Sequence, residues 1–242
     1  MLVEKRSDPV LSRRGRQWAT LVVLGLLTVD VLVTGLELVT GSLVEGRSAL
    51  LDIWDTVKVF AIAAVSIWAA GRLRSRGLAI FAAVFGLIGV EDLFFWHGRF
   101  GRTLSAYFDF GFLPVADSSA WGEFLALTAV AALGGILAWT VSDRWPGYRT
   151  VRRHLTLMLV VLFFFATVVD LIADASGQNP LLTLIEETGE RFTLSMIGGY
   201  MAGLGYTTMK RGGWAWHRNV ERPSVTSRPD VTGRRSSPGS GA

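Results

Sequence analysis

The sequence predicts an all-α integral membrane protein: a six-transmembrane helical bundle with both termini on the cytoplasmic side and a disordered C-terminal tail. Three observations indicate this fold class. Half of the 242 residues are hydrophobic and only 18% are charged, whereas about 25% is usual for a soluble domain. Apolar runs recur that are long enough to cross a hydrocarbon core about 30 Å thick. The basic residues gather in the short segments between these runs.

The predicted spans follow a basic N-terminal segment, residues 1–17. They are expected at about 18–40, 51–71, 77–97, 120–141, 154–175 and 184–208. A longer loop is expected between the third and fourth spans. Small residues in the sixth span, GGYMAGLG, predict close helix packing. The remaining segment, 209–242, is basic and contains few large apolar residues, so we expect it to be a disordered cytoplasmic tail.

The distribution of Lys and Arg predicts the orientation of the spans. Of the 24 basic residues, 19 lie in the N-terminal segment, in the loops after the second and fourth spans, and in the C-terminal segment. These parts can share one side of a membrane only if the number of spans is even. Tryptophans near the span ends are typical of an aromatic belt at the two interfaces. We therefore expect a multi-pass protein of the cell membrane, of the kind found in the bacterial cytoplasmic membrane.

Composition also excludes several kinds of site. The chain has no cysteine, so disulfides, thiolate catalysis and cysteine metal sites are excluded. Its net charge of +4 and pI near 9.8 would suit a nucleic-acid partner. However, the aromatic residues lie within the predicted spans and are not interleaved with the basic ones, as a base-stacking surface requires. We expect no nucleic-acid partner.

The carboxylates gather on the side opposite to the basic residues. All six predicted spans carry an acidic residue near the outer end, and ionisable groups at that depth need a partner, a proton or an ion. Spacings of three or four residues place several of them in pairs on one helix face. We therefore expect an outward-facing cavity that binds a metal or another cation. Its predicted ligands are Asp55, Glu91, Asp92, Asp170, Asp174, Glu187 and Glu190.

Two further charges are predicted to lie deeper. Asp30 is near the middle of the first span, where a charge costs about 2.5–3.5 kcal/mol. We interpret Asp30 as a proton relay towards the inner side and Lys58 as its counter-ion; a purely structural role for Lys58, as partner of Asp55 or Asp30, is the simpler alternative. Additional candidates near the same side are Glu37, Glu123, His97 and Arg191.

Three functions are compatible with this pattern. The favoured one is binding or transport of a cation or protons. The second is a membrane metalloenzyme acting on a lipid or a small extracellular substrate, with a divalent metal ion as cofactor that activates water. The third is a non-catalytic scaffold or accessory subunit, in which the acids make interhelical hydrogen bonds. The expected partners are the lipid bilayer, a cation or small-molecule ligand and, in an oligomer, further copies of the chain.

Overall fold

The structure, a computed structural model, describes residues 10–40, 49–94, 96–107, 118–177 and 179–210. These residues are almost entirely helical. The helices are α1 (Arg13–Thr40), α2 (Ala49–Leu73), α3 (Arg76–Phe94), α4 (Trp96–Tyr107), α5 (Ser118–Thr140), α6 (Tyr148–Phe163), the π-helical turn η2 (Phe164–Val169), α7 (Asp170–Ala175) and α8 (Pro180–Lys210). Because α6, η2 and α7 follow one another without a break, they form a single long helical segment.

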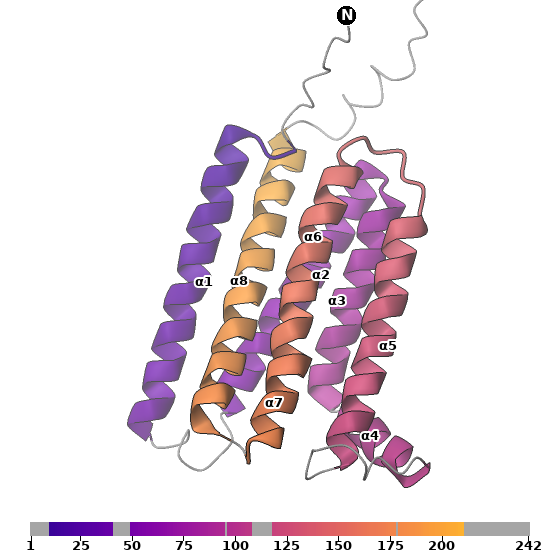
Figure 1. Cartoon of the computed structure of the whole chain (residues 1–242). Helices are drawn as coiled ribbons and strands as arrows, with labels where there is room; N and C mark the ends of the chain where they lie inside the picture. The colour runs from indigo at the N-terminus through magenta and orange to yellow at the C-terminus, as the bar shows by residue number, and fades with distance from the viewer. Residues whose placement is uncertain (1–9, 41–48, 95, 108–117, 178, 211–242) are drawn as a thin grey trace, which may run out of the picture.

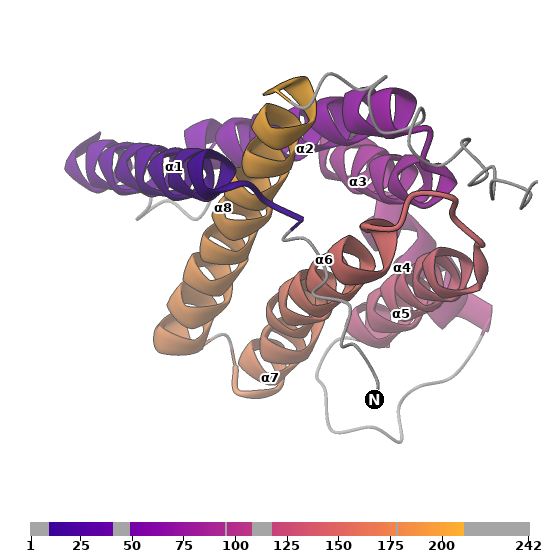
Figure 2. The ribbon, with the colours of Figure 1, turned by 90° about the horizontal axis from the view of Figure 1, so that it is seen from above.

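The long helices run alternately up and down (Figure 1). In this view α1, α8, α6 and α5 stand in a front row, α2 and α3 lie behind, and the short α4 crosses the lower end. Seen from above, α1 lies at the edge of the bundle (Figure 2). It packs mainly against α8 and touches α2 less extensively. The N-terminal end of α1, the C-terminal end of α8 and the connections α2–α3 and α5–α6 therefore lie at the same end of the bundle.

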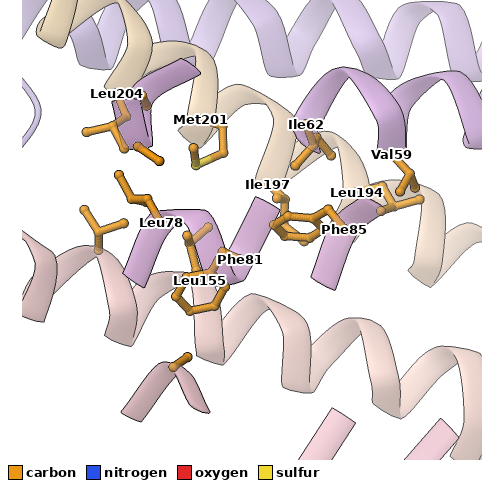
Figure 3. Packing of buried hydrophobic residues seen from close by; sticks show 14 of the residues in the cluster. Val59, Ile62, Leu78, Phe81, Phe85, Leu155, Leu194, Ile197, Met201 and Leu204 are labelled. Carbon is orange, nitrogen blue, oxygen red and sulfur yellow. The ribbon is translucent and has the colours of Figure 1, made fainter. Parts of the chain in front are cut away.

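The hydrophobic core is formed mainly by α2, α3, α6 and α8 (Figure 3). Its largest fully buried side chains include Phe81 and Phe85 of α3, which lie beside Leu155 of α6 and Ile197 of α8, respectively. By contrast, the residues of α1 whose burial is described and that are buried are Gly15 and Asp30. The core therefore draws on helices that are rich in apolar residues on several faces, whereas α1 presents most of its apolar surface outward.

The prediction of six membrane spans is wrong. Among the described residues, two helical stretches are long and apolar enough to cross a membrane, namely Arg13–Leu36 and Tyr148–Ala173. The part of α5 that passes the same composition test, Thr128–Thr140, is shorter. The error has a physical cause: an apolar helix can serve a protein core as well as a lipid bilayer. Some of the apolar residues of α2, α3 and α8 lie in the core, and these helices also carry charges.

Other predicted boundaries can be compared directly. Each of the six predicted segments is helical, and the helices extend a few residues beyond most of the predicted limits. The loop expected after the third segment instead begins with the amphipathic helix α4, which packs against α5. The tail predicted to be disordered lies outside the described residues, apart from Met209 and Lys210 at the end of α8.

Close packing of α1 on α8 depends on glycine, as the small residues of the last segment predicted. A Cβ atom on Gly203 would lie 2.6 Å from the carbonyl oxygen of Gly15, and one on Gly199 would lie 2.7 Å from the carbonyl oxygen of Ala19. Backbone atoms cannot easily move away from such contacts. At the end of the same row, Thr207 accepts a hydrogen bond of 3.2 Å from the backbone N–H of Ser12. The prediction of close packing is confirmed here.

At the same end of the bundle, Asp143 joins two connections. It accepts hydrogen bonds from the Ser75 hydroxyl at 2.5 Å, the Gly77 N–H at 2.9 Å and the Trp145 N–H at 2.8 Å. In the turn between α2 and α3, Arg74 has φ 49°. The N–H groups of Arg74 and Ser75 donate to the carbonyls of Gly71 and Ala70, respectively, at the end of α2, which is the Schellman pattern of helix termination. Asp143 thus ties the α5–α6 connection to the first turn of α3.

Candidate functional site

Charged side chains from α1, α2 and α8 meet in the half of the bundle that lies away from Asp143. We call this group the charge network. Its members are Asp30, Asp55, Lys58, Glu187 and Arg191. They come from helices that are far apart in the sequence, so the network exists only once the three helices have packed.

Lys58 lies at the buried centre of the network. Its side chain is 2% exposed, and its ammonium nitrogen lies 2.8 Å from Asp30 Oδ1 and 2.7 Å from Asp55 Oδ1. The contact with Asp30 is a hydrogen bond. The contact with Asp55 is an ion pair without hydrogen-bond alignment, because no described group donates to Asp55 Oδ1 with suitable geometry. One ammonium thus serves carboxylates from two helices.

Asp30 is held by more than its cation. The indole N–H of Trp54 donates a hydrogen bond of 2.6 Å to Asp30 Oδ1, and the Ser195 hydroxyl donates one of 2.9 Å to Oδ2. These bonds give both oxygens of the buried carboxylate a donor. Asp30 is thus fixed by α2 and α8 at once, although it belongs to α1.

Arg191 connects Asp55 to Glu187. Its Nε donates to Asp55 Oδ2 at 3.2 Å, and its terminal nitrogen donates to Glu187 Oε2 at 3.1 Å. Burial lowers the pKa of the guanidinium, but the charges of Asp55 and Glu187 and their hydrogen bonds outweigh burial and raise this pKa above its usual value. Arg191 therefore stays charged and acts as a fixed clamp on the two carboxylates.

Helical spacing explains why these side chains meet. Asp55 and Lys58 are three residues apart on α2, and Glu187, Arg191 and Ser195 follow one another at intervals of four on α8. Such spacings put side chains on one face of a helix. Continuing the α8 row by four residues leads to Gly199 and Gly203, which contact α1. The same face of α8 thus carries the network and, next to it, the site where α1 packs.

The structure places some predicted ligands in the network and others elsewhere. Asp55 and Glu187 belong to it, and the predicted pair Asp30 and Lys58 is in contact. The remaining described candidates, Glu91, Asp170 and Glu190, are partly buried on α3, α7 and α8. Within the described part of the chain, no three His, Asp or Glu side chains are grouped in a way that could hold a metal ion. The predicted ligand set is therefore not assembled by these residues.

Several candidates cannot be placed in this way. The side chains of Glu37, Asp92, His97, Glu123 and Asp174 lie outside the described residues, although their backbone positions are helical. The binding of a divalent metal ion thus stays a prediction that depends on these five side chains.

Two residues that bond to the charge network, Trp54 and Ser195, were not predicted from the sequence. The sequence assigned Trp54 to the interfacial aromatic belt, yet its indole bonds to Asp30. A signal was present, because Trp54 lies four residues before Lys58 and Ser195 lies four residues after Arg191. Both therefore share a helix face with a member of the network.

Comparison with known proteins identifies a domain but no activity. Residues 51–204 match the family model described as "Domain of unknown function (DUF8692)". No curated protein and no solved structure matches the chain. The matched region runs from α2 into α8 and contains four members of the charge network. It excludes α1, which supplies the fifth member, Asp30.

Proposed function

The chain belongs to the DUF8692 family, whose description assigns no function, and we propose that it is a membrane protein that binds protons in the charge network and passes them through it. In this proposal the two apolar helical stretches, Arg13–Leu36 and Tyr148–Ala173, hold the chain in the bilayer. The observation that carries the proposal is the continuous contact of five charged groups whose formal charges do not cancel.

The charge balance favours a bound proton. Three carboxylates and two cations give the network a formal charge of −1 when all five groups are ionised. An uncompensated charge is costly where the carboxylate is buried, as it is at Asp30, and one proton on a carboxylate removes it. A proton is favoured over a metal ion because the described carboxylates form no group of three that could coordinate one.

The three carboxylate side chains of the network become less exposed from Glu187 through Asp55 to Asp30, which gives proton uptake a direction. The Glu187 side chain is 37% exposed, that of Asp55 is 23% exposed, and that of Asp30 is 9% exposed. Arg191 does not release its proton in a protein, so the carboxylates and Lys58 carry the exchanging proton. Uptake begins at Glu187. From Asp55 the proton passes to Asp30, the innermost member, by way of Lys58. The ammonium gives one proton to Asp30 Oδ1 at 2.8 Å and takes the proton of Asp55 at 2.7 Å, so that Asp55 is again ionised and Lys58 is again charged.

Proton flux into proteoliposomes tests the proposal. A pH-sensitive dye inside the vesicles reports flux driven by a membrane potential for the wild type, Asp30→Asn, Asp55→Asn and Asp52→Asn. Asp52 lies one turn before Asp55 on α2 but is exposed, so Asp52→Asn is the matched control. We expect both network variants to lose most of the flux while the control keeps it. Unchanged flux in Asp30→Asn would reject the relay.

The accessory-subunit hypothesis is the second candidate, and one observation favours it. Every charge of the network already has a partner within the chain, as a structural network would require. This hypothesis predicts no proton flux in the wild type. It also predicts no infrared band of a protonated carboxylic acid that disappears in Asp55→Asn, whereas proton binding predicts such a band.

A further inference from the structure

Basic side chains crowd the end of the bundle opposite the charge network. We call this surface the arginine end. Its exposed members include Arg13, Arg14, Arg72, Arg76, Arg149 and Arg153. They belong to the N-terminal end of α1, the α2–α3 and α5–α6 connections with the start of α6, and the C-terminal end of α8, which the topology brings together (Figure 1).

This positive surface is not neutralised by the described carboxylates around it. The acidic residue described at this end is Asp143, and both of its oxygens accept hydrogen bonds from Ser75, Gly77 and Trp145. Asp143 holds the connections together, and its single negative charge is outnumbered by the exposed arginines around it. Charge complementarity therefore calls for an anionic partner from outside the chain.

Aromatic and apolar side chains lie directly beside the arginines. Arg152 stacks over the ring of Trp139 at 4.3 Å, and Arg72 lies 5.8 Å from the ring centre of Trp68. Trp18 stacks on Tyr206 with ring centres 5.7 Å apart. Trp18 and Trp139 are also about half exposed, at 48% and 50%. Tryptophan next to arginine, at the border of an apolar surface, is typical of a membrane interface.

The apolar surface continues along the helices from this end. Leu21 and Leu24 on α1, Leu133 and Leu137 on α5, and Leu157 on α6 are all about half exposed or more. A nucleic acid would leave these side chains in water. A lipid monolayer would cover them with acyl chains, while its headgroups meet the arginines. The sequence of arginine, tryptophan and leucine thus fits the depth profile of a lipid leaflet.

We infer that the arginine end binds the headgroups of anionic phospholipids, so that this end of the bundle lies against a negatively charged membrane surface. The inference is independent of proton binding and shares with the proposed function only the membrane placement. Each arginine close to an anionic surface contributes about a fivefold factor in affinity. Several together give a clear preference for anionic over zwitterionic lipid that weakens as salt is added.

Tryptophan quenching by brominated lipids in mixed maltoside micelles tests this inference with the full chain. Brominated phosphatidylglycerol and brominated phosphatidylcholine are compared at equal mole fraction. The test variant is Arg149→Gln/Arg153→Gln on α6. The matched control is Arg99→Gln/Arg102→Gln on α4, which removes two exposed arginines at the other end. We expect the preference for phosphatidylglycerol to fall about 25-fold in the test variant, a factor of five for each arginine, and to persist in the control.

Several results would overturn the inference. The first is an unchanged preference in the test variant. The second is an equal loss in both variants, which would show a general effect of net charge. The third is displacement of phosphatidylglycerol by a DNA duplex at equal phosphate concentration, which would assign the surface to nucleic acid. Quenching by phosphatidylcholine without any preference defeats this inference alone, whereas quenching by neither lipid also counts against the membrane placement.

Discussion

The two ends of the helix bundle hold their charges in opposite ways. In the charge network, side chains from α1, α2 and α8 are partly or fully buried and pair with one another. At the arginine end, the cations are exposed and the described carboxylate, Asp143, bonds to backbone N–H groups and a hydroxyl instead. At one end the charged groups pair with one another within the chain, whereas at the other end the cations face outward.

This difference predicts different consequences of mutation. A buried ion that loses its partner has no water to replace it, so the folded state is destabilised. An exposed arginine keeps its hydration when a neighbour is removed, so stability changes little. Changes in the charge network should therefore alter folding, whereas changes at the arginine end should alter what the surface binds.

The largest effect is expected for Lys58→Met. The substitution keeps much of the side-chain volume but leaves the carboxylates of Asp30 and Asp55 without their shared cation. Removing one partner of a buried ion pair costs about 3–5 kcal/mol. The free energy of unfolding in detergent, measured by denaturant titration, checks this. Adding Asp30→Asn should restore part of the loss, since one uncompensated charge then disappears. A double variant as unstable as the sum of both single variants would contradict a direct interaction.

A smaller effect is expected where α1 packs against α8. In Gly203→Ala the new methyl group would meet the carbonyl oxygen of Gly15 at 2.6 Å, so the helices must separate, at a cost of about 1–3 kcal/mol. Gly25→Ala is the control, because nothing lies within 4 Å of the added atom. It should stabilise the helix slightly, since alanine favours helices over glycine. Thermal unfolding that ranks the two variants in the opposite order would refute this packing.

Sequence reasoning located the helices but not their environment. Asp30 and Lys58 were expected to pair, because isolated charges among apolar residues need partners, and the structure places them in contact. The number of membrane spans could not be obtained in the same way. Phe81 and Phe85 contribute to hydrophobicity whether they face lipid or, as here, Ile197 and other core residues. Only the packed structure separates these two uses of an apolar side chain.

The same limit applies to polar residues. Trp54 near a helix end is typical of an interfacial tryptophan, yet its N–H lies 2.6 Å from Asp30 Oδ1. That partner comes from another helix, and spacing within one helix cannot reveal it. The role of Asp143 was likewise hidden, because its bonds to Ser75 and Gly77 join connections more than sixty residues apart.

Asp143→Ala should have a moderate effect at the arginine end. The substitution removes the acceptor at the first turn of α3, and loss of such a cap costs about 1–2 kcal/mol. Ser75→Ala removes one of the three donors and also the hydroxyl that accepts a hydrogen bond of 3.2 Å from the Leu78 N–H, so we expect a loss of similar size, about 1–2 kcal/mol. Denaturant titration of both variants checks this. A Ser75→Ala variant as stable as the wild type would contradict a capping role for this hydroxyl at the start of α3.

The smallest effect on stability is expected for Arg149→Gln/Arg153→Gln. Both side chains are exposed, and surface substitutions away from special contacts leave stability almost unchanged. The unfolding midpoint in a neutral detergent should therefore match that of the wild type within the scatter of the measurement. In micelles that contain phosphatidylglycerol, the wild type should gain stability from lipid binding, and the variant should gain less. If the variant is already destabilised in neutral detergent, these arginines make internal contacts, and the contrast between the two ends of the bundle fails.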